Sequence, residues 1–214
     1  MPAQTHAYTL QQIQTMIAVL PEPAATIVGV AGLAGLREGE IEGLCWEDYT
    51  NGELHIRRSI WEGHISTPET EASIDAVPVI KPLAVLLDMH RLRCGNPVSG
   101  PIFATTKGTH QSLGNIRIRQ VLPVLRRNSL LPQWHGWHAF RRGLATNLHE
   151  LGVPDKVIQK ILRHKNVSVT QACYTQPRDP AIAAAMQKLE QQLISLDTNW
   201  TPEAIPAGGS GSVN

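Results

Sequence analysis

The sequence predicts an α+β domain that is mainly α-helical, with a small antiparallel β-hairpin or sheet on one edge. Over most of the chain, apolar residues recur every three or four positions, which is typical of amphipathic helices. Alternation of apolar and polar residues is confined to residues 53–61 and 74–80, which we expect to pair as strands. The 42% hydrophobic and 17% charged fractions are those of an ordinary soluble globular protein.

The predicted helices follow from their apolar spacing and end signals. Thr9 is placed to cap a helix to about Leu20, with Gln12 completing a capping box. Further helices are expected over residues 23–33, 37–44, 82–93, 112–127, 138–151, 154–162, 168–175 and 180–196. Pro123 should kink the basic helix that Ser112 begins, whose expected core face is Leu113, Ile116, Ile118, Val121, Leu122 and Leu125. Pro78 predicts an edge position for the second strand.

The expected domain organisation is one folded unit. We predict a disordered lead over residues 1–8, a domain over 9–196 and a disordered tail over 197–214. No apolar run approaches the roughly 20 residues that a membrane helix needs, and no signal peptide is recognisable. The cysteines Cys45, Cys94 and Cys173 are odd in number and form no CxxC pair, so neither a disulfide framework nor a cysteine zinc site is indicated. A reducing cytoplasm is therefore the expected compartment.

The charge is distributed unevenly along the chain, although the net charge is only +1. Residues 1–80 hold three Lys/Arg against eleven Asp/Glu, a balance of −8. Residues 81–178 hold fifteen against three, a balance of +12, and residues 179–214 return to −3. A basic segment of this size indicates a polyanion-binding surface. The alternative is that the acidic segment folds back and neutralises it.

The segment 136–154 is predicted to be a helix and a tight turn, and it carries a chemically distinctive pair. An apolar stripe is predicted on one side of this helix by Phe140, Leu144, Leu148 and Leu151. His138 and Arg141 are three positions apart, so they share a helix face that is rotated away from this stripe. An imidazole and a guanidinium held together can bind a phosphate; the alternative is a solvated polar face. Arg37 opens an earlier short helix, where a salt bridge to Glu40 or Glu47 is the simplest interpretation.

Four motifs in order resemble the catalytic domain of the tyrosine recombinases, the phage integrase family, between about Thr9 and Leu196. Residues 35–40 (GLREGE), followed by 44–48 (LCWED), are similar to the box with the first catalytic arginine, with Glu40 as its supporting acid. Residues 67–79 are similar to the hairpin that carries the catalytic lysine. Residues 138–141 match the HxxR box, and 161–170 followed by Tyr174 resemble the box with the second histidine and the nucleophile.

The resemblance implies a mechanism and a set of residue roles. A tyrosine, here Tyr174, attacks the scissile phosphate of double-stranded DNA and forms a 3′-phosphotyrosyl link, without metal, ATP or other cofactor. Arg37 and Arg141 would bind the phosphate oxygens. His138 would hydrogen-bond the phosphate or take the proton of the tyrosine, and His164 would add a donor to the same oxygens. DNA contacts are expected from Arg117, Arg119, Arg142, Arg163 and Lys165. Self-association on DNA, as a tetramer in the family, and a bacterial or phage-encoded, nucleoid-associated protein are implied.

Three departures from the family pattern bear on activity. Glu69 stands where the family has its lysine, the usual proton donor to the leaving 5′-oxygen, which predicts impaired cleavage unless another lysine such as Lys107 substitutes. The nucleophile usually follows the histidine by nine residues, but that position is Cys173 and Tyr174 is tenth. The family's separate N-terminal helical domain is not recognisable, so we expect weak specific DNA binding.

Two other interpretations were compared with this one. Residues 138–164 could form a helix-turn-helix of a non-enzymatic DNA-binding module, which leaves Arg37 and Tyr174 unexplained. A metal site could use His135, His138, His149 and His164, but no carboxylate or cysteine accompanies them at ligand spacing. An integrase-like fold that binds DNA but is disabled at Glu69 remains the main alternative.

Overall fold

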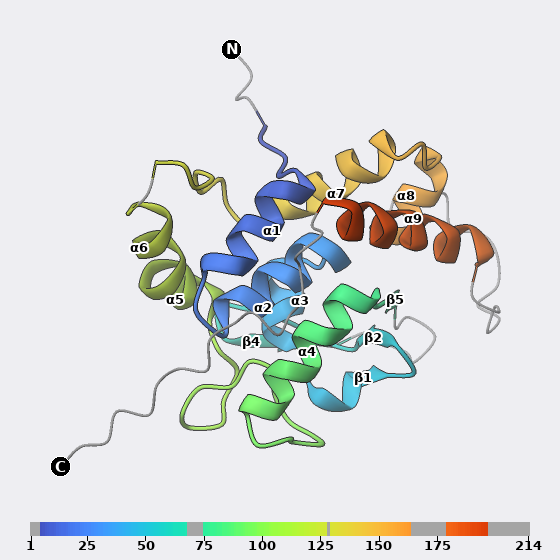
Figure 1. Ribbon diagram of the computed structural model, residues 1–214. Helices are drawn as coiled ribbons and strands as arrows, with labels where there is room; N and C mark the ends of the chain where they lie inside the picture. Colours follow the sequence, from blue (N-terminus) through green and yellow to red (C-terminus); the bar gives the residue numbers. More distant parts are fainter. Residues whose placement is uncertain (1–4, 68–74, 128, 164–178, 197–214) are drawn as a thin grey trace.

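The computed structural model describes residues 5–67, 75–127, 129–163 and 179–196 (Figure 1). In these ranges the chain is mainly helical with two small antiparallel sheets, as the sequence predicts. The expected helix over 168–175 and the expected tail from 197 lie outside the described residues. Among the described helices, none is long and apolar enough to cross a bilayer.

The first helices form the centre of the core. Helix α1 (Leu10–Val19) begins with the predicted capping box: the Gln12 N–H donates to Thr9 Oγ1 at 3.2 Å, and the Thr9 N–H donates to Gln12 Oε1 at 3.0 Å. The expected helix over 23–33 is α2 (Ala24–Gly29) continued by the π-helical turn η1 (Val30–Ala34). Every residue of α2 and η1 is buried, so this segment is the axis about which the other elements pack.

The two sheets divide what the sequence predicted as one strand over 53–61. Strands β1 (Tyr49–Thr50), β2 (Glu53–Ile56) and β5 (Asp75–Pro78) form a sheet in the order β1–β2–β5. Strands β3 (Ser59–Trp61) and β4 (His64–Ser66) form a separate hairpin. The single strand was wrong because the Arg57 N–H turns back to the His55 carbonyl at 3.1 Å. Pro78 lies on the edge strand β5, as predicted.

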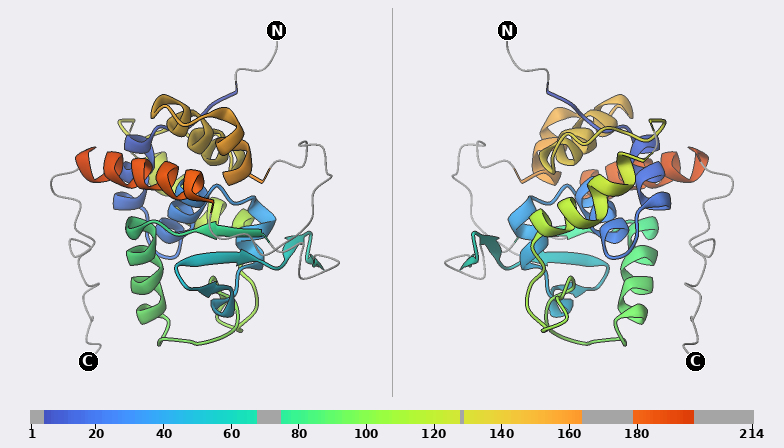
Figure 2. Two further views of the ribbon diagram at one scale, coloured as in Figure 1. Left: turned by 90° about the vertical axis from the view of Figure 1, so that its right-hand side faces the viewer. Right: turned by 90° about the vertical axis from the view of Figure 1, so that its left-hand side faces the viewer.

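The remaining long helices lie on two sides of the buried α2–η1 segment. Figures 1 and 2 place the strands and α4 (Lys81–Arg93) on one side, and α7 (His138–Glu150), α8 (Asp155–Ile161) and α9 (Pro180–Leu196) on the other. Of the predicted apolar stripe, Phe140, Leu144 and Leu148 of α7 are fully buried, whereas Leu151, the C-cap, is partly buried. Each such side chain contributes about 1.5–3 kcal/mol by leaving water, so α7 is held firmly against the core.

The basic helix predicted over 112–127 is irregular. It consists of α5 (Leu113–Ile116), the π-helical turn η4 (Arg117–Val121) and α6 (Leu122–Leu125), and Pro123 lies just after the π-helical turn. Ile118 was expected in the core, but its side chain is 57% exposed. The π-helical turn changes the angle per residue, so a stripe drawn at 3.6 residues per turn loses its register there.

The segment before α1 is part of the fold. Tyr8 is buried, its N–H donates to the Ala139 carbonyl at 3.3 Å, and its hydroxyl donates to the Gln133 carbonyl at 2.9 Å. Its backbone crosses α7 so closely that a Cβ at Gly143 would collide with the Tyr8 carbonyl. The packed part of the chain therefore begins before Thr9, where the sequence predicted its start.

Candidate functional site

Arg37 is held by a carboxylate on the next turn of the chain. It is the N-cap of α3 (Glu38–Gly43), and its N–H donates to Glu40 Oε2 at 2.7 Å. Its guanidinium Nη1 also donates to Glu40 Oε1 at 2.8 Å. The side chain remains 42% exposed. The salt bridge that composition suggested is therefore present, and it orients Arg37 while leaving it accessible.

Arg141 reaches the same turn from α7. Its Nη1 donates to the Gly35 carbonyl at 2.6 Å, a contact between residues 106 positions apart. Arg141 is buried, and within the described part of the chain its Nη2 has no hydrogen-bond partner. Burial, together with the charges of Arg37 and Arg163, lowers the pKa of Arg141 to about 10, against the pull of Glu40. The guanidinium is still charged at neutral pH.

Arg163 joins Arg37 and Arg141 in one cluster; it directly follows Leu162, the C-cap of α8. Its Nη2 donates to Glu40 Oε2 at 2.8 Å, and its side chain is only 6% exposed. Its carbonyl lies 3.4 Å from Arg37 Nη2. Glu40 therefore accepts from two arginines that are far apart in the sequence. The sequence suggested Arg163 only as a general DNA contact, because nothing in a linear pattern links positions 40 and 163.

The cluster has an excess of positive charge. Three guanidinium groups, of Arg37, Arg141 and Arg163, surround the single carboxylate of Glu40, which leaves a net charge of +2. Burial alone would raise the pKa of Glu40, but Arg163 and Arg37 outweigh burial and hold it below its ordinary value. Glu40 is thus ionised and cannot neutralise the cluster, so the site favours an anion.

His138 is the first residue of α7, one turn before Arg141, and its side chain is exposed. It acts electrostatically on Glu38 of α3, as does Arg117 of η4. Burial and the neighbouring Glu42 raise the pKa of Glu38, and the charges of His138 and Arg117 only partly offset them. His138 is therefore close enough to α3 to act on Glu38 through its charge. The structure brings Arg37, Arg141 and Arg163 into one cluster, with His138 near it.

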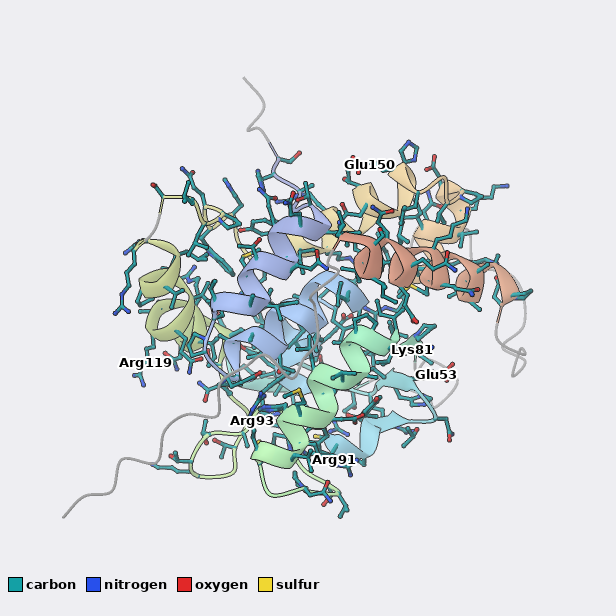
Figure 3. All side chains as sticks on the ribbon, viewed as in Figure 1. Glu53, Lys81, Arg91, Arg93, Arg119 and Glu150 are labelled. Carbon is teal, nitrogen blue, oxygen red and sulfur yellow. The ribbon has the colours of Figure 1, made fainter. Side chains whose placement is uncertain are left out.

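The other predicted DNA contacts differ in the exposure of their side chains and in their hydrogen bonds within the fold. Arg117 and Arg119 are exposed on η4, and Figure 3 shows Arg119 projecting from the side of the molecule formed by α5–α6. Arg142 is half-buried, and its Nε donates to the His6 carbonyl at 2.8 Å, which ties the first described residues to α7. Part of the Arg142 side chain is therefore committed to the fold.

Several predicted residues lie outside the described ranges. They are Glu69, His164, Lys165, Cys173 and Tyr174. Lys107, considered as a substitute for the family lysine, lies in an exposed turn where its N–H donates to Thr105 Oγ1 at 3.3 Å.

Two of the four histidines considered as metal ligands, His135 and His149, have other partners. His135 stacks on His6 with ring centroids 3.7 Å apart, and His149 contacts Asp155 at 3.2 Å. His138 and His149 stand at opposite ends of α7, about 16 Å apart at 1.5 Å per residue, so they cannot share an ion. Among the described residues, no group of three or more His, Cys, Asp or Glu side chains is placed to hold a metal.

The described residues thus form a mainly helical domain with small antiparallel sheets, in which two arginines from distant segments converge on one turn. The chain belongs to the phage integrase family, the tyrosine recombinases, because the model of that family matches residues 7–180. The fold and family predicted from the four motifs are thereby confirmed.

Known proteins resemble the chain in sequence and in structure. It is 32% identical over 168 residues to the tyrosine recombinase XerC-like protein of Caldanaerobacter subterraneus, a match that covers 66% of this chain and 42% of that protein. The chain thus spans about two fifths of that relative's length. Solved structures with the same fold include the Tn1549 transposon integrase in complex with a circular intermediate DNA (TM-score 0.63, 18% identity, 88% of this chain and 67% of that one). The XerA recombinase is also similar, with a TM-score of 0.60 and 18% identity over 88% of this chain and 65% of that one. The lambda integrase catalytic core has a TM-score of 0.52 and 21% identity over 75% of this chain and 96% of that one.

Proposed function

We propose that this chain is the strand-cleaving and rejoining domain of a site-specific DNA recombinase or integrase. The Tyr174 hydroxyl attacks the scissile phosphorus of double-stranded DNA, the bond to the 5′-oxygen breaks, and a 3′-phosphotyrosyl ester and a free 5′-hydroxyl result. The 5′-hydroxyl of a partner strand then attacks the ester and releases the tyrosine. The ester conserves the bond energy, so the proposed reaction balances without ATP, metal or another cofactor.

The observation that carries the proposal is the convergence of Arg37 and Arg141. Arg141 is fixed by the Gly35 carbonyl and keeps a buried, unpartnered Nη2, while Arg37 is fixed by Glu40 and remains accessible. Guanidinium groups held in this way are suited to non-bridging phosphate oxygens, which they bind through charge-assisted hydrogen bonds. Because the donors are already oriented, they stabilise the charge that develops in the transition state without further reorganisation.

The remaining roles follow from position and chemistry. His138 would hydrogen-bond the phosphate or take the proton of the tyrosine, and His164 would add a donor. A phenol has a pKa near 10, so Tyr174 needs such assistance at neutral pH. The proposed DNA contacts outside the cluster are Arg117, Arg119, Arg142 and Lys165. Solved structures of an integrase and a recombinase with the same fold are complexes with DNA, which supports DNA as the partner. A cytoplasmic location and self-association on DNA are proposed by family analogy.

A second function is favoured by one residue. Glu69 places a carboxylate where the family uses a proton-donating lysine, and a like charge about 4 Å from a phosphate costs on the order of 4 kcal/mol at an effective dielectric of about 20. In this case the chain binds DNA through the same arginines but cleaves it poorly or not at all. The two functions differ in covalent chemistry and share the binding surface.

A suicide substrate, nicked so that the cleaved strand diffuses away, separates these functions. Purified protein is incubated with the labelled substrate, and the covalent adduct is counted after denaturation. The proposed function predicts an adduct in low yield that disappears in Tyr174→Phe and persists in Cys173→Ala. An adduct that survives Tyr174→Phe would overturn the nucleophile assignment. DNA binding without any adduct would favour the binding module.

A further inference from the structure

Arg163 has an unusual backbone for its residue type. It follows Leu162, the C-cap of α8, and its φ of 54° is in the left-handed region that favours glycine. A non-glycine residue is disfavoured there because its Cβ approaches the backbone carbonyl oxygen too closely. Its N–H donates to the Lys160 carbonyl at 3.0 Å, so the turn closes the helix in the ordinary way. The conformation would suit glycine better, so the arginine side chain needs another explanation.

The Arg163 side chain is buried but only partly satisfied. Its Nη2 donates to Glu40, whereas its Nε and Nη1 are buried and have no hydrogen-bond partner among the described residues. Arg141 Nη2 is in the same state. A buried charged donor without an acceptor is costly, and here two side chains bear three such nitrogen atoms in one cluster. An anion that accepts from them would remove this cost.

The anion cannot be supplied by Glu40. This carboxylate already accepts from the Arg37 N–H, Arg37 Nη1 and Arg163 Nη2. The cluster also keeps its net charge of +2 after Glu40 is counted. A phosphodiester carries one negative charge, and attack by a phenolate brings the charge of the transition state to two. The excess charge of the cluster therefore matches a phosphate that is being attacked.

We propose that Arg163 is a third guanidinium that binds the scissile phosphate directly, beside Arg37 and Arg141. The inference rests on the proposed function and deepens it, because it assigns a ligand to a residue outside the family's catalytic set. Glu40 holds Arg163 by Nη2 and leaves the Nε–Nη1 edge for a non-bridging phosphate oxygen. Arg163 is thus a phosphate ligand rather than a general contact to the DNA backbone.

Inorganic phosphate tests the inference without cleavage. The melting temperature is followed as sodium phosphate replaces sodium chloride at constant ionic strength, for the unaltered chain, Arg163→Gly, Arg163→Lys and the control Arg127→Gly at an exposed arginine. We expect phosphate to stabilise the unaltered chain and the control equally. Its apparent affinity should fall about tenfold or more in Arg163→Gly, because a charge-assisted bond is lost, and less in Arg163→Lys. Arg163→Gly relieves the backbone conformation but also loses the ion pair with Glu40, so the phosphate response of each variant is measured from its own melting temperature in chloride.

Two outcomes would overturn the inference: no stabilisation of the unaltered chain by phosphate, or equal phosphate affinity in Arg163→Gly. Arg163 could instead affect phosphate binding only by positioning Glu40. This alternative is tested by measuring phosphate affinity in Glu40→Gln and in the double variant Glu40→Gln/Arg163→Gly. Direct binding predicts that Arg163→Gly still weakens phosphate affinity in that background, whereas a positioning residue would have no further effect. Failure of the proposed function is a separate result, because it is a missing Tyr174-dependent adduct in the suicide assay while phosphate binding remains.

Discussion

Arg141 Nη1 donates to the backbone carbonyl of Gly35 at 2.6 Å and so fixes α7 to the turn that precedes α3. Gly35 has a φ of 64°, and a Cβ there would lie 2.7 Å from a Leu144 methyl carbon. The turn therefore needs glycine both for its conformation and for its contact with α7. Two of the motifs seen in the sequence are joined by this bond, and the position of the Arg141 guanidinium is set by backbone rather than by flexible side chains.

We expect Arg141→Met to separate stability from activity. Burial beside Arg37 and Arg163 lowers the pKa of Arg141 to about 10, so the folded state disfavours its charge at every pH below that value. Methionine removes this penalty and fills similar volume. The melting temperature at pH 7 in chloride buffer should be unchanged or higher, while adduct formation falls about 10²–10³-fold.

The matched control for this variant is Arg127→Met at an exposed position. It should leave both the melting temperature and the adduct yield close to those of the unaltered chain. A fall of several degrees in Arg141→Met, absent from the control, would mean that the bond to the Gly35 carbonyl outweighs the buried charge.

Glu40→Gln should destabilise the chain in a pH-dependent way. The ion pairs with Arg163 and Arg37 outweigh burial and hold the pKa of Glu40 below 4.5, its ordinary value. A carboxyl whose pKa is lowered by folding stabilises the fold above its unfolded pKa, and this stability is lost as pH falls through the folded value. Urea unfolding at pH 7 and at successively lower pH should therefore show a difference that is largest at pH 7 and shrinks below about pH 4.

The comparison with Glu38→Gln makes the test specific. Burial and Glu42 raise the pKa of Glu38, the opposite direction, so its neutral variant should be no less stable than the unaltered chain at pH 7. A Glu40→Gln difference that stays constant down to pH 3 would contradict the ion-pair origin of the stability.

Local signals predicted the elements well where the helix is regular. The Thr9–Gln12 capping box and the Phe140–Leu144–Leu148 stripe depend on neighbours within a few residues, and the structure has both. The Ile118 prediction was wrong because a π-helical turn changes the angle per residue. The strand over 53–61 was wrong because alternation continues through a break that only hydrogen bonding reveals.

The site was predictable in its local part only. Arg37 and Glu40 are three apart at a helix start, so their ion pair follows from sequence. The Arg163–Glu40 pair joins residues 123 positions apart, and the burial of the Arg163 side chain depends on segments that are distant in the sequence. Neither the composition of the sequence nor the spacing of its residues predicts a contact between positions so far apart. The family motifs predicted that Arg141 lies near Arg37. The buried nitrogen atoms of Arg141 and Arg163 that have no partner among the described residues could be recognised only in the folded structure.

Glu69→Lys should raise the adduct yield on the suicide substrate by at least tenfold. It removes a like charge beside the phosphate, worth on the order of 4 kcal/mol at about 4 Å, and restores a proton donor for the leaving 5′-oxygen. Glu69→Gln removes the charge without restoring the donor, so its gain should be smaller. If neither variant changes a Tyr174-dependent yield, residue 69 does not approach the phosphate.

DNA affinity should fall steeply with salt, because the basic middle segment releases counterions from the DNA. Arg119 is exposed on η4 and is expected to contact one phosphate, so Arg119→Gln should reduce the slope of log affinity against log salt by about one. Lys81 is 88% exposed and lies on the other side of the molecule (Figure 3), so Lys81→Gln removes the same charge where no DNA contact is proposed. Fluorescence anisotropy with a labelled duplex between 50 and 300 mM salt, on the order of the range where such slopes are measured, compares the variants. Equal slopes for Arg119→Gln and Lys81→Gln would remove η4 from the proposed DNA surface.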